Sequence, residues 1–383
     1  MNILILNYEY PPLGGGAGIV TQQLAELLAK QENKVVVLTT WFSGEPEFHI
    51  EGNLTIIRLR SKRKHTYQSN PLEMLSWMRM AKNYIDNFVD DFNFDICLAN
   101  FTLPGGEVAL HLKKKRNIPF VVLSHGHDIP WFHPKQMFFW HTLFYFKIKQ
   151  ILKLSSANIL LTPQMKDIAD SFIGKGHNDK NIIIPNGLEF LNFRRGFNGE
   201  ETEIKALFVG RLVEQKNPLI VVKAFEKLQK INLPISLKII GDGKLKEEIE
   251  NYIFHNQIQN IKILGRMSQS EVIQEMQNAH LLIAPSKAEA MSMSILEAIS
   301  CGMYVLASNI SGNKELIMDG FNGCFVKEEV DIIEKIKLFY NEKFTKNYQY
   351  PEELFKYLNQ KYAWEKTVSD YKELFERIIS KDK

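Results

Sequence analysis

Lys205-Ala-Leu-Phe-Val-Gly-Arg-Leu-Val-Glu-Gln-Lys-Asn-Pro218 is the stretch of sequence that decides the fold. Its apolar run up to Gly210 predicts a buried strand, and Asn217 before Pro218 predicts the cap and first residue of a helix. Leu219–Lys230 continues with apolar residues at three- and four-residue spacing, so a strand passes into an amphipathic helix. The same step recurs along nearly the whole chain, which predicts parallel sheets covered by helices on both faces.

The other strand candidates are short, apolar and rich in β-branched residues. In the first half they are Asn2–Leu6, Lys34–Thr39, Leu54–Leu59, Asp95–Ala99, Phe120–Ser124, Asn158–Thr162 and Ile182–Ile184; in the second half they are Ser236–Ile240, Ile261–Leu264, Leu281–Ala284 and Tyr304–Ala307. The series restarts at about Lys205, after a turn-rich polar stretch at 194–201 that we interpret as a linker. The expected fold class is α/β, with two doubly wound Rossmann-like domains at residues 1–193 and 194–364.

The composition is that of a soluble globular protein: 383 residues, 45% hydrophobic and 24% charged. Three cysteines without metal-ligand spacing, and no apolar run long enough for a signal peptide or a membrane span, favour a cytoplasmic protein. The net charge of +3 is too small to indicate nucleic-acid binding. The charge is uneven, however, because residues 1–186 hold 20 basic and 16 acidic residues and residues 187–383 hold 27 and 28.

Arg211 and Lys216 lie in the loop between the strand ending at Gly210 and the helix beginning at Pro218. A helix N-terminus at the carboxyl edge of a sheet offers N–H groups and positive potential, to which these two cations would add. We therefore predict a phosphate or diphosphate site there. The alternative is that both side chains are solvated loop charges.

Glu289 and Glu297 bracket the start of a second predicted helix. Each ends a Ser-x-x-Glu pattern, Ser286–Glu289 and Ser294–Glu297, so capping boxes alone could explain both carboxylates. Two carboxylates near exposed helix N–H groups would also suit a ligand that carries hydroxyls next to phosphate, because carboxylates accept from hydroxyls. A sugar nucleotide has that chemistry.

Two further loops follow strands in the first half. Gly14–Gly16 allows a ligand to approach the backbone closely, although a flexible turn is the simpler interpretation. Ser124-His-Gly-His-Asp128 places His125 at the carboxyl edge of a buried strand. Metal binding by His125, His127 and Asp128 lacks a fourth suitably spaced ligand, which leaves a polar contact to substrate or a structural histidine.

Short motifs follow one another along almost the whole chain. They are Tyr10-Pro-Pro-Leu-Gly-Gly-Gly16, His125-Gly-His-Asp128, Pro185-Asn-Gly187, Val209-Gly-Arg-Leu-Val-Glu-Gln-Lys216, Ile240-Gly-Asp-Gly-Lys-Leu245, Leu264-Gly-Arg-Met-Ser268, Ala284-Pro-Ser-Lys-Ala-Glu289, Glu297-Ala-Ile-Ser-Cys-Gly302, Ser311-Gly-Asn-Lys-Glu315 and Tyr362-Ala-Trp-Glu365. In this order they resemble glycosyltransferase family 4, a group of retaining, nucleotide-sugar-dependent enzymes with two facing Rossmann-like domains (the GT-B fold).

The resemblance implies a role for each matching position. Arg211 and Lys216 would hold the donor diphosphate, and the Gly15–Gly16 loop would close over it. Glu289 would contact the transferred sugar, with His125 beside that sugar. The remaining positions concern the rest of the donor: Glu297 on the ribose hydroxyls, the backbone of Arg266 and Met267 beside the base, and the helix entered at Met293 and Ser294 on the phosphates. A last helix at 365–383, marked by Trp364, would pack back on the N-terminal domain.

The implied activity is that of a retaining hexosyltransferase, which moves a sugar from a UDP- or GDP-sugar to a glycan or lipid-linked acceptor in the synthesis of surface polysaccharides or other glycoconjugates. The family also implies independence of metal, same-face attack and no covalent nucleophile. Two alternatives stay open: a sugar-nucleotide 2-epimerase, and a non-catalytic nucleotide-binding partner subunit. The second is suggested by Ala290 and Ser292, where the family usually has glycine, and by Tyr304, where it usually has proline.

The acceptor is expected on the N-terminal domain. Arg60–His65 and His111–Arg116 are basic clusters, and Pro130–Trp140 mixes aromatic with basic residues. These stretches are either solvated charge and loop packing, or a peripheral contact with the anionic inner face of the cytoplasmic membrane and a lipid-linked or phosphate-bearing acceptor. The oligomeric state is not indicated by the sequence.

Overall fold

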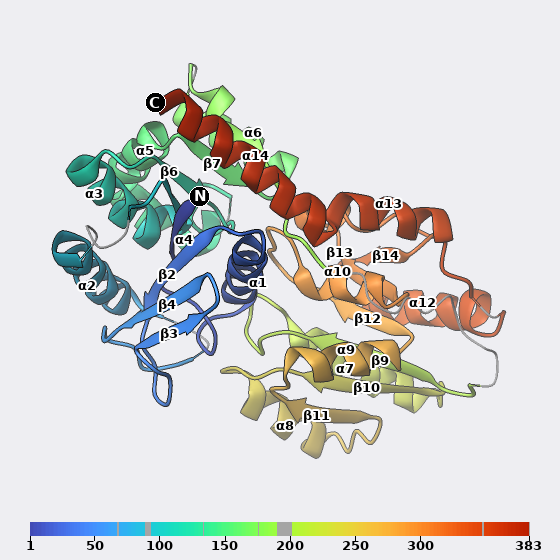
Figure 1. Cartoon of the computed structure of the whole chain (residues 1–383). Coiled ribbons are helices and arrows are strands. Elements are labelled where there is room, and N and C mark those ends of the chain that lie inside the picture. The colour runs from blue at the N-terminus through green and yellow to red at the C-terminus, as the bar shows by residue number, and fades with distance from the viewer. Residues whose placement is uncertain are drawn as a thin grey trace. The chain divides into compact units, whose positions relative to one another are not determined.

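The computed structural model describes residues 1–66, 69–88, 93–132, 134–174, 176–189, 201–346 and 348–382. The chain divides into two compact units (Figure 1). The first comprises Met1–Gly187 and Trp364–Lys383, and the second comprises Leu188–Ala363. The predicted boundary between residues 193 and 194, and the predicted linker up to residue 200, lie outside the described residues.

The first unit is built on an eight-stranded sheet in the order β3-β4-β2-β1-β5-β6-β7-β8. All neighbouring strands are parallel except the pair β3 and β4. The strands are β1 Asn2–Leu6, β2 Lys34–Thr40, β3 Phe48–Glu51, β4 Leu54–Leu59, β5 Ile96–Asn100, β6 Phe120–Leu123, β7 Ala157–Leu160 and β8 Asn181–Ile183. The α-helices are α1 Gly16–Lys30, α2 Pro71–Phe88, α3 Glu107–Arg116, α4 Pro134–Leu143, α5 Tyr145–Leu154, α6 Pro163–Ile173 and α14 Trp364–Asp382.

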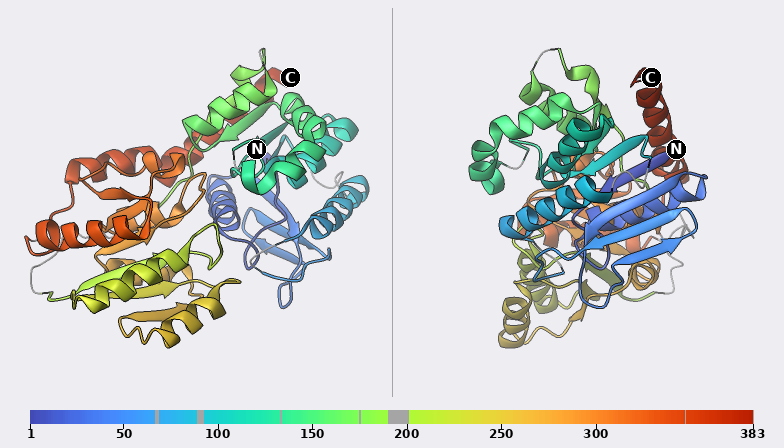
Figure 2. Two further views of the ribbon diagram at one scale, coloured as in Figure 1. Left: turned by 180° about the vertical axis from the view of Figure 1, so that it is seen from behind. Right: turned by 60° about the vertical axis from the view of Figure 1, so that its left-hand side comes forward.

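The second unit is built on a six-stranded parallel sheet in the order β11-β10-β9-β12-β13-β14. Its strands are β9 Ile204–Val209, β10 Ile235–Ile240, β11 Ile261–Gly265, β12 Leu281–Ala284, β13 Tyr304–Ser308 and β14 Gly323–Val326. Its α-helices are α7 Pro218–Lys230, α8 Lys246–His255, α9 Gln269–Gln277, α10 Met293–Ser300, α11 Ser311–Lys314, α12 Glu329–Phe339 and α13 Glu352–Tyr362. Helices cover the strands of each sheet on both faces (Figures 1 and 2).

The predicted fold class is confirmed, since both units are doubly wound α/β sheets. In each sheet the strand order reverses once, between β1 and β5 and between β9 and β12. At such a switch point the two connections leave in opposite directions, so the carboxyl ends of the strands border a crevice. The packing beneath is apolar: Trp77, Phe120 and Phe225 are among the largest side chains that are almost completely buried.

Two strands were missed by the sequence patterns. All four residues of β3 are exposed, so it lacks the apolar alternation that predicts a half-buried strand. The signal that could have revealed it is Gly52-Asn53, which joins β3 to β4 in a tight antiparallel turn. β14 is a four-residue edge strand, and a Cβ on its Gly323 would lie 2.3 Å from the Val305 carbonyl oxygen.

The C-terminal helix α14 belongs to the first unit. Trp364, its first residue, donates from Nε1 to Gln23 Oε1 on α1 at 3.2 Å. The ring lies directly against Gly187, where a Cβ would come within 2.5 Å of it. The glycine of the Pro185-Asn-Gly187 motif therefore makes room for the tryptophan of the Tyr362–Glu365 motif.

Candidate functional site

Lys216 and Glu289 meet at the switch point of the second sheet. Lys216 lies in the loop after β9 and Glu289 in the loop after β12, and the Lys216 Nζ to Glu289 Oε1 distance is 2.5 Å. Only 18% of the lysine side chain and 10% of the glutamate side chain are exposed. Two residues 73 positions apart thus form a partly buried ion pair, so Lys216 is not a solvated loop charge. Arg211 is exposed.

The loop that carries Lys216 is braced by the loop after β10. Gly210 N donates to the Ile240 carbonyl and Leu212 N donates to the Asp242 carbonyl, at 3.0 and 2.9 Å. A Cβ on Gly241, whose φ is +141°, would lie 1.9 Å from the Gly210 carbonyl oxygen. The glycine in Ile240-Gly-Asp-Gly is therefore required by the close approach of two backbones.

The α10 N-terminus lies beside the same loop and carries no side-chain cap. Ser292 is the N-cap residue, and its hydroxyl makes no capping hydrogen bond. The predicted Ser294–Glu297 capping box is wrong, because the helix already begins at Met293 and Ser294 is its second residue. Glu289 does not complete a box with Ser286 either, because it pairs with Lys216 in a loop. The first N–H groups of α10 lack a capping side chain and suit an anion.

Glu297 is a buried carboxylate on α10. Its Oε1 accepts from Gln269 Nε2 at 2.7 Å. Burial raises the pKa of Glu297 to about 7, while the Gln269 hydrogen bond and the Lys216 charge oppose that rise. The carboxyl group therefore changes charge near neutral pH.

Arg266 and Met267 follow β11 and immediately precede α9. Arg266 is exposed and Met267 is half-buried. Because Gln269 begins α9 and contacts Glu297, the hydrogen bond ties this segment to α10. Arg266, Met267 and Glu297 are thereby brought to one side of the second unit, as the roles implied for them require.

His125 lies beside the switch point of the first sheet, in the loop after β6, the strand next to β5. Its Nε2 is 2.9 Å from Asn100 Oδ1, and Asn100 Oδ1 also accepts from Thr21 Oγ1 at 3.0 Å. Asn7 Nδ2 donates to Thr21 Oγ1 at 2.8 Å, which completes a buried chain of polar side chains. Since an amide oxygen carries no hydrogen, Nε2 of His125 must be protonated and Nδ1 carries a lone pair.

The His125 ring is neutral over the physiological pH range. Burial lowers its pKa to about 4, and the Asp128 carboxylate opposes that effect only in part. The ring also packs on Phe101, with 4.6 Å between ring centroids. Phe101 has a φ of +64°, a strained conformation for a residue with a side chain. His125 is thus held as a neutral acceptor.

Asp128 closes the loop that presents His125. Its Oδ1 accepts from His125 N at 2.9 Å, and its Oδ2 accepts from the N–H and hydroxyl of Thr102 at 2.8 and 3.1 Å. Both carboxylate oxygens are thus used in positioning the backbone. Within the described ranges, no group of three His, Cys, Asp or Glu residues could hold a metal ion.

The glycine-rich loop of the first unit passes directly into a helix. Gly15 is the N-cap and Gly16 is the first residue of α1. Gly14 has a φ of +88°, and a Cβ there would lie 2.7 Å from Glu9. A Cβ on Gly15 would meet nothing within 4 Å, so its lack of a side chain leaves open space before the helix.

The three departures from the family pattern lie in different surroundings. Tyr304 begins β13, and its hydroxyl lies 3.2 Å from the Gly323 carbonyl oxygen in a cluster with Phe339 and Tyr348. It lies about 13 Å, four residues of strand, from the carboxyl edge, so it has a packing role. Ala290 and Ser292, by contrast, are buried between Glu289 and α10, within the candidate site.

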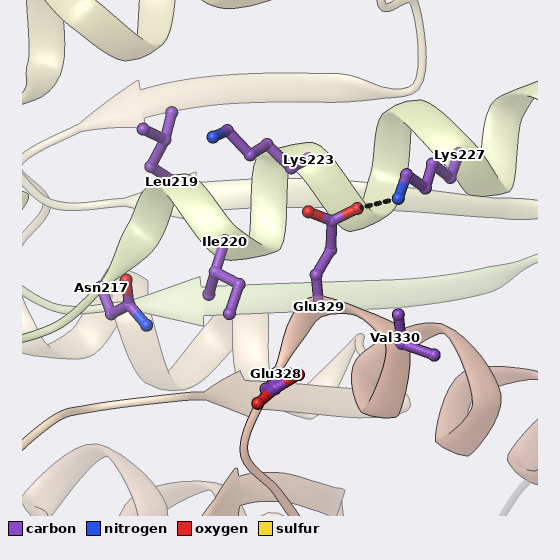
Figure 3. Close-up of a pocket in the computed structure, with 8 residues that line it drawn as sticks. All are labelled: Asn217, Leu219, Ile220, Lys223, Lys227, Glu328, Glu329 and Val330. Carbon is purple, nitrogen blue, oxygen red and sulfur yellow. Dashed lines mark ion pairs between the residues drawn. The ribbon is translucent and has the colours of Figure 1, made fainter.

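A crevice of about 380 Å³ lies between α7 and the start of α12 (Figure 3). Its charges are balanced, because Lys223 and Lys227 face Glu328 and Glu329, and Lys227 already pairs with Glu329 at 2.8 Å. Neither Lys216 nor Glu289 lines it. The crevice is therefore separate from the candidate site.

Sequence reasoning missed the partners of the candidate residues. Asn7 and Asn100 stand where β1 and β5 end, so polar residues at neighbouring strand ends could have indicated them. Gln269 gave no signal, since it lies 28 positions from Glu297 in an ordinary helix start.

Comparison with known proteins identifies the family to which each half of the chain is similar. Residues 14–190 match the family model described as Glycosyltransferase Family 4, and residues 190–356 match the model described as Glycosyl transferases group 1. An uncharacterized glycosyltransferase of Methanocaldococcus jannaschii is 26% identical over 99% of both chains. The chain belongs to glycosyltransferase family 4, as its motifs predicted.

Solved structures agree on the GT-B fold. Sucrose-phosphate synthase from Thermosynechococcus elongatus has a TM-score of 0.85 at 16% identity, over 99% of both chains. Anabaena HepE, solved in complex with UDP-glucose, has a TM-score of 0.74 at 17% identity, over 99% of this chain and 100% of that one.

Removing one partner of the Lys216–Glu289 pair should destabilise the second unit. Lys216→Met leaves a carboxylate that is 90% shielded without its cation, which should cost about 1–3 kcal/mol of unfolding free energy. The double variant Lys216→Met/Glu289→Gln should recover part of that loss. Chemical denaturation of the wild type, both single variants and the double variant measures the coupling. A loss in the double variant equal to the sum of the two single-variant losses would show that the pair is not formed in solution.

Replacing the amide that faces His125 by a carboxylate should change the charge of the ring. Asn100→Asp places a negative charge about 2.9 Å from Nε2, which stabilises the imidazolium and should raise the His125 pKa well above 4. An NMR titration of the ring protons measures it. Asn117→Asp, an exposed change at the end of α3, is the matched control and should leave the His125 pKa unchanged. An unaltered pKa in Asn100→Asp contradicts the assigned hydrogen bond.

Proposed function

We propose that this protein is a retaining hexosyltransferase that uses a UDP- or GDP-sugar as donor and a glycan or lipid-linked saccharide as acceptor. The observation that carries the proposal is the Lys216–Glu289 pair beside the uncapped N-terminus of α10. A cation and helix N–H groups suit a diphosphate, and a neighbouring carboxylate suits a sugar hydroxyl. A surface-glycan role is supported by two partial relatives, the Salmonella typhimurium lipopolysaccharide 1,2-N-acetylglucosaminetransferase and the Escherichia coli UDP-Gal:alpha-D-GlcNAc-diphosphoundecaprenol alpha-1,3-galactosyltransferase.

The proposed reaction makes one bond and breaks one at the anomeric carbon. The bond to the nucleotide diphosphate breaks and leaves negative charge on the phosphate oxygen, while the sugar gains oxocarbenium character. Arg211, Lys216 and the α10 N–H groups stabilise the leaving oxygen, where fixed donors contribute most. The acceptor hydroxyl forms the new bond on the same face, and its proton passes to the leaving phosphate.

The carboxylates and His125 act on the donor's hydroxyls. Glu289 leaves Lys216 for the transferred sugar once the diphosphate takes the cation, and Glu297 accepts from the ribose. His125 offers the bare Nδ1 of a neutral ring to the sugar. The proposal includes no metal, so a chelator should leave the rate unchanged, and it places the enzyme in the cytoplasm.

A screen of UDP-, GDP- and ADP-sugars by thermal shift identifies the donor, because a specific ligand raises the melting temperature. Transfer with that donor should be lost in Lys216→Ala and Glu289→Ala and kept in Lys223→Ala, a control at a lysine on α7. NMR of the product should show retained anomeric configuration.

If the protein forms an epimer from the donor alone, its activity is that of a 2-epimerase instead. Binding of a nucleotide with neither transfer nor epimer formation would favour the non-catalytic nucleotide-binding subunit that Ala290 and Ser292 suggest.

Nucleotide binding should strengthen as pH rises through 7. Below that pH Glu297 is protonated and can accept less well from two ribose hydroxyls, and above it the carboxylate is ionised. Affinity should therefore rise several-fold between pH 6 and 8 and then level off. Calorimetry at several pH values measures this, and Glu297→Gln should bind weakly with no such slope. An equal slope in Glu297→Gln would assign the titration to another group.

A further inference from the structure

The first unit exposes an unusual number of aromatic side chains along α4 and α5. Phe146 is 84% exposed and Phe139 is 67% exposed. Trp131, Phe138, Leu143 and Phe144 are also exposed. Single exposed apolar residues are ordinary, whereas six large ones within sixteen residues need an explanation.

We call these six exposed side chains the aromatic face. Trp131 contacts Phe138, and Trp140 contacts both Phe139 and Phe144, with ring centroids 5.3 to 6.2 Å apart. The rings therefore pack on one another at the surface. α4 and α5 contact each other, which keeps the exposed side chains of both helices in one region of the first unit.

The sequence around the aromatic face is basic, although Lys147 pairs with Glu107 at 2.6 Å and Lys166 pairs with Asp170 at 2.5 Å. No acidic residue occurs between Asp128 and Asp167, while that stretch holds five lysines. At the far end of α5, Lys180 Nζ donates to the carbonyls of Lys153 and Ser155 at 2.7 and 2.8 Å. The Lys113 charge on the last turn of α3 contributes, after burial, to lowering the pKa of Lys180. Basic groups thus gather where α3 and α5 end.

Several basic residues in the other basic stretches of the first unit form contacts within the protein. Arg60 pairs with Glu47 at 2.6 Å, and the Arg63 side chain, 2% exposed, donates to the His65 carbonyl. His111 and Lys115 both lie near Asp86. Lys114 is exposed on the last turn of α3. Because Lys147 on α5 also pairs with Glu107, at 2.6 Å, Lys114 and Lys153 at the ends of α3 and α5 are the lysines that we assign to a partner.

We propose that the aromatic face of α4 and α5 seats the protein on an anionic phospholipid bilayer, with the lysines at the ends of α3 and α5 on the headgroups. Aromatic rings are favoured at the membrane interface, where lysine stems can reach up to the phosphates. A protein partner fits less well, because protein interfaces are depleted in lysine. Among the described helices none is long and apolar enough to cross a bilayer, so the contact would be peripheral.

Membrane contact would bring the protein to a lipid-linked acceptor, and in that respect the inference rests on the proposed function. α5 is about 15 Å long, so rings at its start and lysines at its end can meet the same lipid surface. Vesicle binding needs neither donor nor transfer, so the surface and the activity can fail separately.

The test is flotation of the full chain with vesicles of phosphatidylcholine alone or with one-third phosphatidylglycerol. We expect binding to the anionic vesicles and its loss at high salt. Phe139→Ser/Phe146→Ser should weaken it more than tenfold, and Lys114→Glu/Lys153→Glu several-fold. The matched controls Phe254→Ser, at a 79% exposed phenylalanine on α8, and Lys244→Glu should bind like the wild type.

Circular dichroism and the melting temperature verify that each variant is folded, and Phe138→Ser/Leu143→Ser repeats the test at other positions of the aromatic face. Equal binding to both vesicle types, or undiminished binding by folded aromatic variants, would overturn the proposal. The proposal would also be overturned if the wild type did not bind vesicles but formed an oligomer in light scattering, and if Phe139→Ser/Phe146→Ser abolished that oligomer. That result would assign the face to a second copy of the chain.

Discussion

The candidate chemistry of this protein depends on one topological constraint, the reversal of strand order in each parallel sheet. Between β1 and β5, and between β9 and β12, the following connections turn to opposite faces, so the carboxyl ends of these strands border a crevice. Each switch point holds polar side chains paired with one another: the chain from Asn7 to His125 in the first unit, and Lys216 with Glu289 in the second.

The two polar clusters differ in their electrostatics. In the first, neutral groups fix the tautomer of His125, and burial keeps the ring uncharged. In the second, an ion pair lies beside the uncapped start of α10, and Glu297 changes charge near neutrality. The first cluster is a neutral network of hydrogen bonds, whereas the second combines an ion pair with helix N–H groups that have no capping side chain.

Glycines in motifs that look alike in the sequence have different roles in the structure. Gly241 permits two loops to touch and Gly187 permits a tryptophan to pack, so both serve the fold. Gly15 meets nothing, and the space before α1 stays open. A glycine-rich motif therefore does not by itself indicate a ligand site, because the neighbours that decide its role come from other parts of the chain.

The sequence by itself determined the alternation of strands and helices, most of their boundaries and the loops that carry Lys216, Glu289 and His125, because periodic burial leaves a local pattern. It missed β3, whose residues are all exposed, and it left a capping box open as one explanation of Glu297 because the spacing fitted. Only the tertiary structure decided that Lys216 meets Glu289, that Asn100 orients His125 and that Gln269 reaches Glu297. These contacts depend on which strands become neighbours in the sheet. The spacing of apolar residues indicates which face of an element is buried, but it does not indicate which other element packs against that face.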